Sequence, residues 1–200
     1  KDVWSYSKNR YNQFIAIRLR QRRRKTDDDD RKDTVPFWIG NYHMPCAFRD
    51  PPVMNIHAEM VAKRIQTLAT TENDAYILAG DFNLKPDSAH YRLLTEGAIK
   101  EDDATYPPPK FGIEWESTIA AMRSAYATYG GKEPEFTNFA LTEGMGEPFV
   151  ETLDYIFLSD EWEVTDVKPV PRLEDVDGPL PNEIEPSDHV VIATDLKYSI

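Results

Sequence analysis

Apolar side chains recur along this chain with two periods, and the shorter period predicts strands. Residues Gln13–Arg20 (QFIAIRLR) alternate between apolar and polar positions, which is typical of a half-buried β-strand. We predict a second strand at Val35–His43, and a buried strand at Ala75–Asn83, which is a short apolar run bounded by turn-forming residues. Four further strands are expected at Phe136–Leu141, Glu151–Ser159, Trp162–Val170 and Val190–Leu196.

The longer period predicts helices. In Asn55–Leu68 the apolar side chains fall on one face, at spacings of three to five residues. Ser88–Glu96 predicts a short helix, because Ser88 can cap its first turn and Gly97 follows its last residue. Strands outnumber helices and several connect as hairpins, so the expected fold class is α/β (α+β) with mixed sheets.

Composition points to a folded domain. Hydrophobic residues make up 40% of the chain and aromatic residues 12%, which supplies a core and excludes a disordered chain. The length of 200 residues suits a single domain, expected to span 1–200. No stretch approaches the ~18 apolar residues of a membrane-spanning helix, and we expect an intracellular, cytoplasmic protein. The one cysteine, Cys46, excludes an internal disulfide and a cysteine-rich metal site.

The net charge of the chain limits the kinds of ligand that it can bind. The net charge is −12, which argues against strong binding of long duplex DNA through its phosphates. A nucleotide or a short single strand beside a metal ion remains possible, since a divalent cation reverses the local sign. Six basic residues lie within Arg18–Lys25, followed by four acids at Asp27–Asp30. This block is interpreted as a solvated hairpin loop or, alternatively, as a basic lip that meets phosphate.

Candidate chemistry is concentrated where predicted strands end or begin. Four compact polar groups lie there: Asn41-Tyr42-His43, Gly80-Asp81-Phe82-Asn83, Thr152-Leu153-Asp154-Tyr155 and Pro186-Ser187-Asp188-His189. Active sites are commonly built from the ends of several strands that meet at one rim of a sheet. Carboxylates, an asparagine and histidines that converge there would suit a hard cation and a phosphate, since Mg²⁺ or Mn²⁺ prefers oxygen ligands.

Each group also has a structural explanation. Asp81 and Asn83 could simply shape a turn, because such side chains bond their own backbone. Asp154 could lie on the exposed face of its strand, and the pair Asp188-His189 could belong to a plain loop. We interpret His57 and His90, on the two predicted helices, as structural residues, and Cys46 as unreactive.

The order of these elements resembles a known family. Gly80-Asp81-Phe82-Asn83, Leu153-Asp154-Tyr155-Ile156-Phe157 and Ser187-Asp188-His189, each beside an apolar strand, resemble the endonuclease/exonuclease/phosphatase superfamily. Asn41-Tyr42-His43 is similar to its Asn-x-His element. The segments Ser124-Ala125-Tyr126 and Glu135-Phe136-Thr137-Asn138-Phe139 are similar to its deadenylase, nocturnin and Angel branch. The resemblance implies two mixed β-sheets packed face to face, with helices outside.

The resemblance also implies a metal-dependent attack of water on phosphorus. Asp81 would orient and deprotonate the water, and Asn83 would hold the phosphate or a metal-bound water. Asp154 would fix His189, which would hydrogen-bond the phosphate oxygens. His43 would contact the scissile phosphate or the leaving oxygen.

Further residues would hold the metal and the substrate. The cofactor would be Mg²⁺ or Mn²⁺, with Asp188 and Asp81 in its shell. Asn41, Phe136 and Asn138 would lie in the substrate-binding region, where that branch meets a base or ribose. The expected substrate is RNA, a nucleotide or another small phosphate ester, with a phosphomonoester, a dinucleotide phosphate or a phospholipid headgroup as alternatives.

The chain departs from the family pattern in one respect. The superfamily carries an Asn on its first strand and a Glu, its principal metal ligand, on the next, and no such element precedes Phe14 here. We therefore expect the C-terminal portion of the domain, without its first strands. The alternative is a catalytically inactive relative that serves as a scaffold.

Overall fold

A five-stranded mixed sheet forms the centre of the computed structural model, which describes residues 2–20, 35–141, 144 and 146–199. Its strands, in spatial order, are β1 (Phe14–Arg20), β2 (Pro36–Tyr42), β3 (Ala75–Asp81), β7 (Asp154–Leu158) and β4 (Arg123–Ser124). β2 and β3 are parallel, and every other neighbouring pair is antiparallel. The parallel pair needs a crossover, which a long helix supplies.

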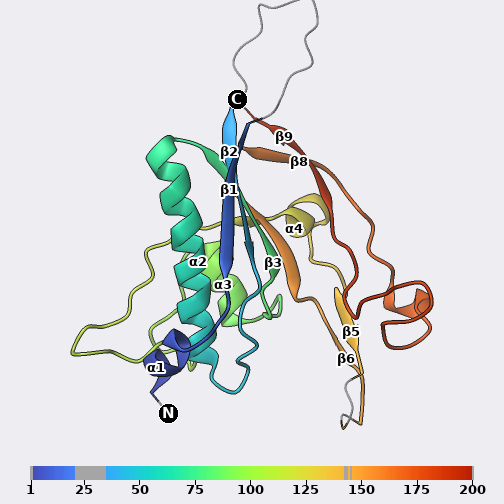
Figure 1. Ribbon diagram of the computed structural model, residues 1–200, viewed down its shortest axis with the longest axis horizontal. Helices are drawn as coiled ribbons and strands as arrows, with labels where there is room; N and C mark the ends of the chain where they lie inside the picture. The colour runs from blue at the N-terminus through green and yellow to red at the C-terminus, as the bar shows by residue number, and fades with distance from the viewer. Residues whose placement is uncertain (1, 21–34, 142–143, 145, 200) are drawn as a thin grey trace, which may run out of the picture.

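Two helices cover one face of this sheet (Figure 1). α2 (Pro51–Glu72) crosses from β2 to β3, and α3 (Ala89–Glu96) follows β3. Ile65 of α2 and Leu93 of α3 are fully buried in one core with Leu78 of β3. α2 exceeds the predicted segment at both ends, because its prolines lie in the first turn, where a missing N–H costs nothing, and Asn73 ends it in the left-handed conformation.

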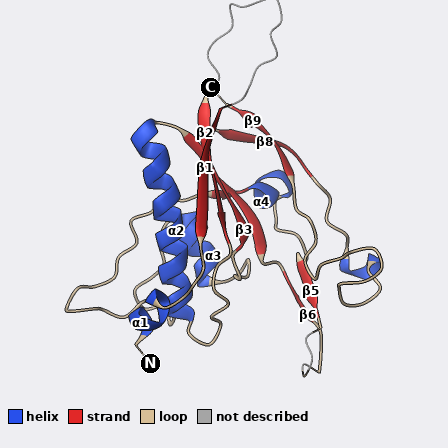
Figure 2. Ribbon diagram, viewed as in Figure 1, coloured by secondary structure: helices blue, strands red, loops and turns tan. Residues whose placement is uncertain are grey.

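A two-stranded antiparallel sheet packs on the opposite face. It consists of β8 (Trp162–Val167) and β9 (Thr194–Tyr198), and the Trp162 ring lies edge-on to Phe37 of β2 at 5.1 Å. A second two-stranded ribbon pairs β5 (Asn138–Ala140) with β6 (Phe149–Glu151). The short helices α1 (Val3–Lys8) and α4 (Ala125–Gly130) and the 3₁₀ turn η1 (Leu173–Asp175) complete the fold (Figure 2).

The expected α/β class with several sheets is confirmed. In the described residues only the central sheet is mixed, and the other two are two-stranded antiparallel ribbons. The predicted strand at Glu151–Ser159 begins only at Asp154, and Glu151 belongs to β6 instead. Of the charged block, Arg18 and Arg20 lie on β1, while positions 21–34 lie outside the described residues. No helix of the described part is long and apolar enough to cross a bilayer.

Candidate active site at the strand ends

The site lies where β3 ends beside the start of β7. Asp81 and Asp154 are register partners in this antiparallel pair, so the pairing alone brings two carboxylates together. Gly80 precedes Asp81 with a φ of +147°, and a Cβ at Gly80 would lie 2.0 Å from the backbone oxygen of Tyr42. Only glycine permits this approach, which draws the end of β2 against the end of β3.

Asn83 shapes the turn that leaves β3. Its φ is +50°, and its backbone N–H donates to Asp81 Oδ1 at 2.9 Å. Its side-chain amide donates to the carbonyl of Met44 at 2.9 Å, and the same Nδ2 lies 3.5 Å from Asp81 Oδ2. The turn-forming interpretation is therefore correct for Asn83, and the turn itself leaves Asp81 Oδ2 facing the other side of the site.

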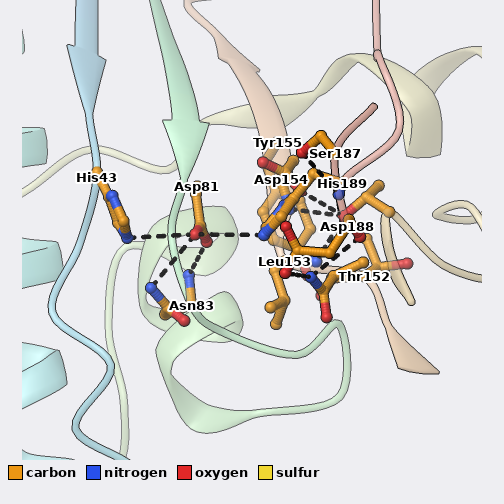
Figure 3. A network of polar contacts seen from close by, with 12 residues as sticks. His43, Asp81, Asn83, Thr152, Leu153, Asp154, Tyr155, Ser187, Asp188 and His189 are labelled. Carbon is orange, nitrogen blue, oxygen red and sulfur yellow. Dashed lines mark hydrogen bonds and ion pairs between the residues drawn. The ribbon is translucent and has the colours of Figure 1, made fainter. Parts of the chain in front are cut away.

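Asp154 is held on one side by a hydroxyl and on the other by an imidazole. Its Oδ2 accepts a hydrogen bond from Thr137 Oγ1 at 2.7 Å. The same oxygen accepts from His189 Nδ1 at 2.7 Å (Figure 3). The buried Thr137 hydroxyl also accepts from the backbone N–H groups of Leu153, at 2.9 Å, and Asp154, at 3.0 Å. This local network fixes the Asp154 carboxylate, and through it the orientation of the His189 ring.

Two histidines flank Asp81 from opposite sides (Figure 3). Its Oδ2 lies 3.3 Å from His43 Nε2 and 4.0 Å from His189 Nε2. The His43 side chain is 72% exposed, and its backbone carbonyl accepts a hydrogen bond from Asn12 Nδ2 at 2.7 Å. An exposed imidazole is thus available to a ligand, while the backbone beneath it is fixed.

The surroundings of Asp81 and His189 raise the pKa of each residue for a different reason. Burial raises the pKa of Asp81, and the neighbouring Asp154 charge adds to the rise, while the Asn83 N–H and the two imidazoles oppose it. The Asp154 hydrogen bond raises the pKa of His189, against the effect of burial. A carboxylate whose proton affinity is enhanced therefore faces an imidazole that favours its cationic form. Such a pair can accept a proton and stabilise an anion.

The remaining predicted site residues lie around this network. Asn138 Nδ2 donates to the Asp188 side chain at 3.3 Å and to its backbone carbonyl at 3.2 Å, so Asn138 positions Asp188. Asn41 is exposed on β2 and donates to the carbonyl of Ala79 at 3.2 Å, outside the polar network. Phe136 corrects an expectation: its ring is fully buried beside Phe139, and so it has no surface to offer a base.

Sequence reasoning missed two supporting residues, Thr137 and Asn12. Thr137 lies within a segment that carried the family resemblance, between two residues that were given roles. A threonine near a strand start is common, and only the pairing of its segment with Glu151, whose carbonyl accepts from the Thr137 N–H, brings its hydroxyl to Asp154. Asn12 precedes its strand without any motif, and no sequence signal identifies it.

The other two histidines and the cysteine lie outside the network. His57 is buried between Tyr42, whose hydroxyl donates to Nδ1 at 2.6 Å, and the Ser7 carbonyl at 3.2 Å. His90 is buried and donates from Nε2 to the Pro51 carbonyl at 3.0 Å. Burial lowers the pKa of both, as befits structural, neutral imidazoles. Burial also raises the pKa of the Cys46 thiol, which opposes thiolate formation.

A divalent cation has an incomplete donor set here. Across the described ranges, no group of three or more His, Cys, Asp or Glu side chains is arranged to hold a metal ion. Asp188, one predicted ligand, is directed toward Asn138, while Asp81 is shared with Asn83 and the histidines. The described side chains therefore do not make a metal site on their own, because hard cations require several oxygen ligands.

Comparison with known proteins places these residues in a family context. Residues 4–189 match the Endonuclease/Exonuclease/phosphatase family. The chain is 32% identical over 172 residues to "Carbon catabolite repressor protein 4 homolog 4" of Arabidopsis thaliana, covering 80% of this chain and 37% of that protein. It is 31% identical over 125 residues to human "2',5'-phosphodiesterase 12", covering 61% of this chain and 19% of that protein. The chain thus spans well under half of each relative.

Solved structures share the fold. The catalytic domain of human Nocturnin with a bound sulfate matches with a TM-score of 0.55 at 18% identity, covering 93% of this chain and 53% of that one. ANGEL2, a 2',3'-cyclic phosphatase in complex with adenosine-2',3'-vanadate, matches with a TM-score of 0.61 at 18% identity, covering 82% and 57%. The predicted resemblance to this branch is confirmed.

Proposed function

The chain belongs to the Endonuclease/Exonuclease/phosphatase family, and from this premise we propose that it hydrolyses a phosphodiester of RNA or of a nucleotide by attack of water on phosphorus. One observation carries the proposal. Asp81 faces His189 across 4.0 Å, and Asp154 holds His189 from behind at 2.7 Å. This arrangement places a proton acceptor next to an imidazole that can donate to a phosphate oxygen.

His189 is the proposed phosphate-binding cation. Its Nδ1–H donates to Asp154, and its Nε2 has no hydrogen-bond partner among the described residues, since the 4.0 Å to Asp81 is too long for one. The Asp154 hydrogen bond raises the pKa of His189, which favours the cationic ring with a proton on Nε2. That N–H can donate to a non-bridging phosphate oxygen, where charge must be neutralised during phosphoryl transfer.

Asp81 is the proposed base. Its Oδ1 accepts a hydrogen bond from the Asn83 N–H, which orients the carboxylate, and its Oδ2 faces the two histidines, where the attacking water would bind. Burial raises the pKa of Asp81 above its ordinary value of 3.8, and a carboxylate with a higher pKa accepts a proton from water more readily. A fixed position also reduces the entropy lost in aligning water with phosphorus.

His43 and Asn83 have supporting roles in the proposal. The exposed His43 imidazole would donate to the scissile phosphate or to the leaving oxygen from the opposite side of Asp81. Asn83 Nδ2 is already engaged with the Met44 carbonyl, which supports a positioning role for this side chain.

The relatives favour a phosphodiester over a phosphomonoester. "2',5'-phosphodiesterase 12" and a "CCR4-Not complex 3'-5'-exoribonuclease subunit Ccr4" of Neurospora crassa, each 31% identical, carry phosphodiester chemistry in their names. A single-stranded or small substrate also suits a chain with a net charge of −12.

A requirement for Mg²⁺ or Mn²⁺ is a separate proposal. Mg²⁺ is commonly bound through one or two carboxylates, with waters and substrate phosphates completing its shell, so Asp81 with the substrate could contribute to such a site. A bound cation would supply neutralisation of phosphate charge. Because the described residues supply an incomplete donor set, the substrate phosphate would have to complete the shell of the cation.

The test compares phosphate esters and two matched aspartate variants in the full-length protein. We expect hydrolysis of bis(p-nitrophenyl) phosphate and adenylyl-adenosine with Mg²⁺, and its loss in EDTA. Asp81→Asn should reduce the rate by on the order of 10²–10⁴. Asp87→Asn removes the same charge from an exposed residue six positions later and should leave the rate unchanged.

The alternatives give different results in the same assay. Hydrolysis of p-nitrophenyl phosphate alone would indicate a phosphomonoesterase. No hydrolysis of any ester with either cation would indicate a catalytically inactive relative. Full activity of the Asp81→Asn variant would reject the proposed base.

A further inference from the structure

A cavity of about 670 Å³ adjoins the site on the side of His43. It is lined by Asn9, Arg10, Tyr11, Asn12, Gln13 and His43. The volume falls within the range of small-molecule binding sites. His43 belongs to both regions, because its ring lines the cavity and its Nε2 lies 3.3 Å from Asp81. A ligand whose reacting phosphate lies at Asp81 can therefore extend past His43 into this cavity.

Arg10 gives the cavity a cation. Its guanidinium donates to the Tyr6 hydroxyl at 3.0 Å and lies over the Tyr6 ring, 5.2 Å from its centroid, so its position is fixed from one side. No ion pair links Arg10 to a carboxylate within the described part of the chain. By contrast, Arg18 and Arg172 each pair with two carboxylates. A guanidinium without a carboxylate is available to an anion.

The electrostatic effect of Arg10 reaches the residues on either side of His43. Burial raises the pKa of Tyr42 to about 12, and the Arg10 charge opposes that rise. Burial raises the pKa of Cys46 as well, with Arg10 again opposing it. The Arg10 charge thus acts on groups near the end of β2, where His43 lies.

Tyr11 adds an exposed aromatic surface. Its side chain is 96% exposed, although it lies between cavity-lining neighbours. Aromatic rings at such positions in proteins that bind single strands stack on bases, with little dependence on which base is present. A guanidinium and an exposed tyrosine ring that line the same cavity therefore match a phosphate next to a base.

We propose that this cavity is a second nucleotide subsite, in which Arg10 binds the phosphate adjacent to the scissile one and Tyr11 stacks on the neighbouring base. The inference rests on the proposed function and sharpens it. The preferred substrate class is an oligonucleotide with at least two phosphates, in preference to a substrate with a single phosphodiester. Asn12 supports the subsite by fixing the His43 backbone between the two phosphate positions.

The test is equilibrium binding by calorimetry, in EDTA so that no turnover occurs. The probes are adenylyl-adenosine and its two forms with an added terminal phosphate, at the 5′ or the 3′ end. We expect one phosphorylated form to bind on the order of tenfold more tightly than the unphosphorylated dinucleotide, as a hydrogen-bonded charge pair provides. Arg10→Met should abolish that difference.

Matched variants separate the subsite from general effects. Arg64→Met removes an exposed arginine from α2 and should retain the wild-type preference. Tyr11→Ala should weaken binding of all three probes by severalfold, whereas Tyr11→Phe keeps the ring and should bind like the wild type. Thermal denaturation of each variant verifies that it is folded.

The outcomes distinguish this inference from the proposed function. Equal affinity of the wild-type protein for all three probes, or a preference that survives Arg10→Met, would overturn the subsite. Hydrolysis of bis(p-nitrophenyl) phosphate depends only on the reacting centre and tests the proposed function by itself.

Discussion

Two regions of this molecule hold histidines in opposite states. In the helix layer, His57 and His90 are buried against a hydroxyl and backbone carbonyls, and burial lowers the pKa of each. At the strand ends, His189 lies against the Asp154 carboxylate, and that hydrogen bond raises its pKa. The comparison teaches that the partner of the ring nitrogen, more than burial alone, decides whether an imidazole stabilises the fold or carries charge for a ligand.

The largest expected effect is a difference in hydrolysis rate between a histidine variant at the strand ends and one in the helix layer. His189→Gln should reduce phosphodiester hydrolysis by on the order of 10²–10⁴, because the donor to the phosphate oxygens is lost. His57→Gln should lower the free energy of unfolding but leave kcat per folded molecule nearly unchanged. Steady-state kinetics, corrected for the folded fraction of each variant, measures kcat, and urea denaturation measures the free energy of unfolding. Equal loss of kcat in the two variants would remove the functional distinction between the regions.

Replacing the Asp154 carboxylate should make His189 more like the neutral, structural histidines of the helix layer. In Asp154→Asn the hydrogen-bond geometry can persist, but the charge that raises the pKa of His189 is absent. We expect that pKa to fall and the rate to decrease by roughly 10–100-fold, as for other groups that orient a functional histidine. NMR titration of the His189 ring measures the first effect. An unchanged pKa would show that Asp154 does not control the charge of His189.

Tyr42 connects the two regions and tests their independence. Its hydroxyl donates to His57, while its backbone oxygen lies against Gly80. Tyr42→Phe leaves His57 Nδ1 without its donor and should reduce the free energy of unfolding by about 1–3 kcal/mol. Urea denaturation measures that loss. A fall in kcat without a loss of stability would instead show that the helix layer sets the geometry of the site.

The smallest expected effect is a pH dependence of opposite sign. Because the folded pKa of His57 is lowered from 6.5, its contribution to stability is present above pH 6.5 and is lost as the pH falls through the lower folded value. Because the folded pKa of His189 is raised from 6.5, its contribution is present below pH 6.5 and is lost as the pH rises through the higher folded value.

Denaturation curves between pH 5 and pH 9 distinguish these two contributions. A single group changes the free energy of unfolding by at most about 1.4 kcal/mol per pH unit. His57→Gln should flatten the acidic side of the stability profile, and His189→Gln should flatten the alkaline side. The opposite assignment of the two slopes would contradict the comparison.

Much of the site was predictable because strand ends are recognisable in sequence. Apolar runs that end in Asp81 and begin near Asp154, together with the Asp188-His189 pair, were sufficient to predict that these side chains converge. Asp81 and Asp154 lie on the paired strands β3 and β7, and His189 forms a β-bridge with Asn138. The short helices α1 and α4, each of six residues, were missed because they contain too few turns to show a period.

The face of a short strand was not predictable. Alternation places Phe136 and Asn138 on one side of their segment and Thr137 on the other, but it does not say which side meets the site. Pairing with β6 on one side and with the segment that carries His189 on the other decided this, because it turned the Thr137 hydroxyl toward Asp154 and left Phe136 in the core. A shift of one residue would have exchanged these roles.

The sequence by itself determined the fold class, the family and the candidate site residues, because hydrophobic period and residue type are local properties. Only the tertiary structure decided the distances between the site residues, the directions of their pKa shifts and the groups that each side chain contacts. Asp81, Asp154 and His189 are far apart along the chain, and their pKa shifts depend on burial and on partners that exist only once β3, β7 and the final segment are assembled. The cavity beside His43 has the same origin, since its lining combines a loop before β1 with the end of β2.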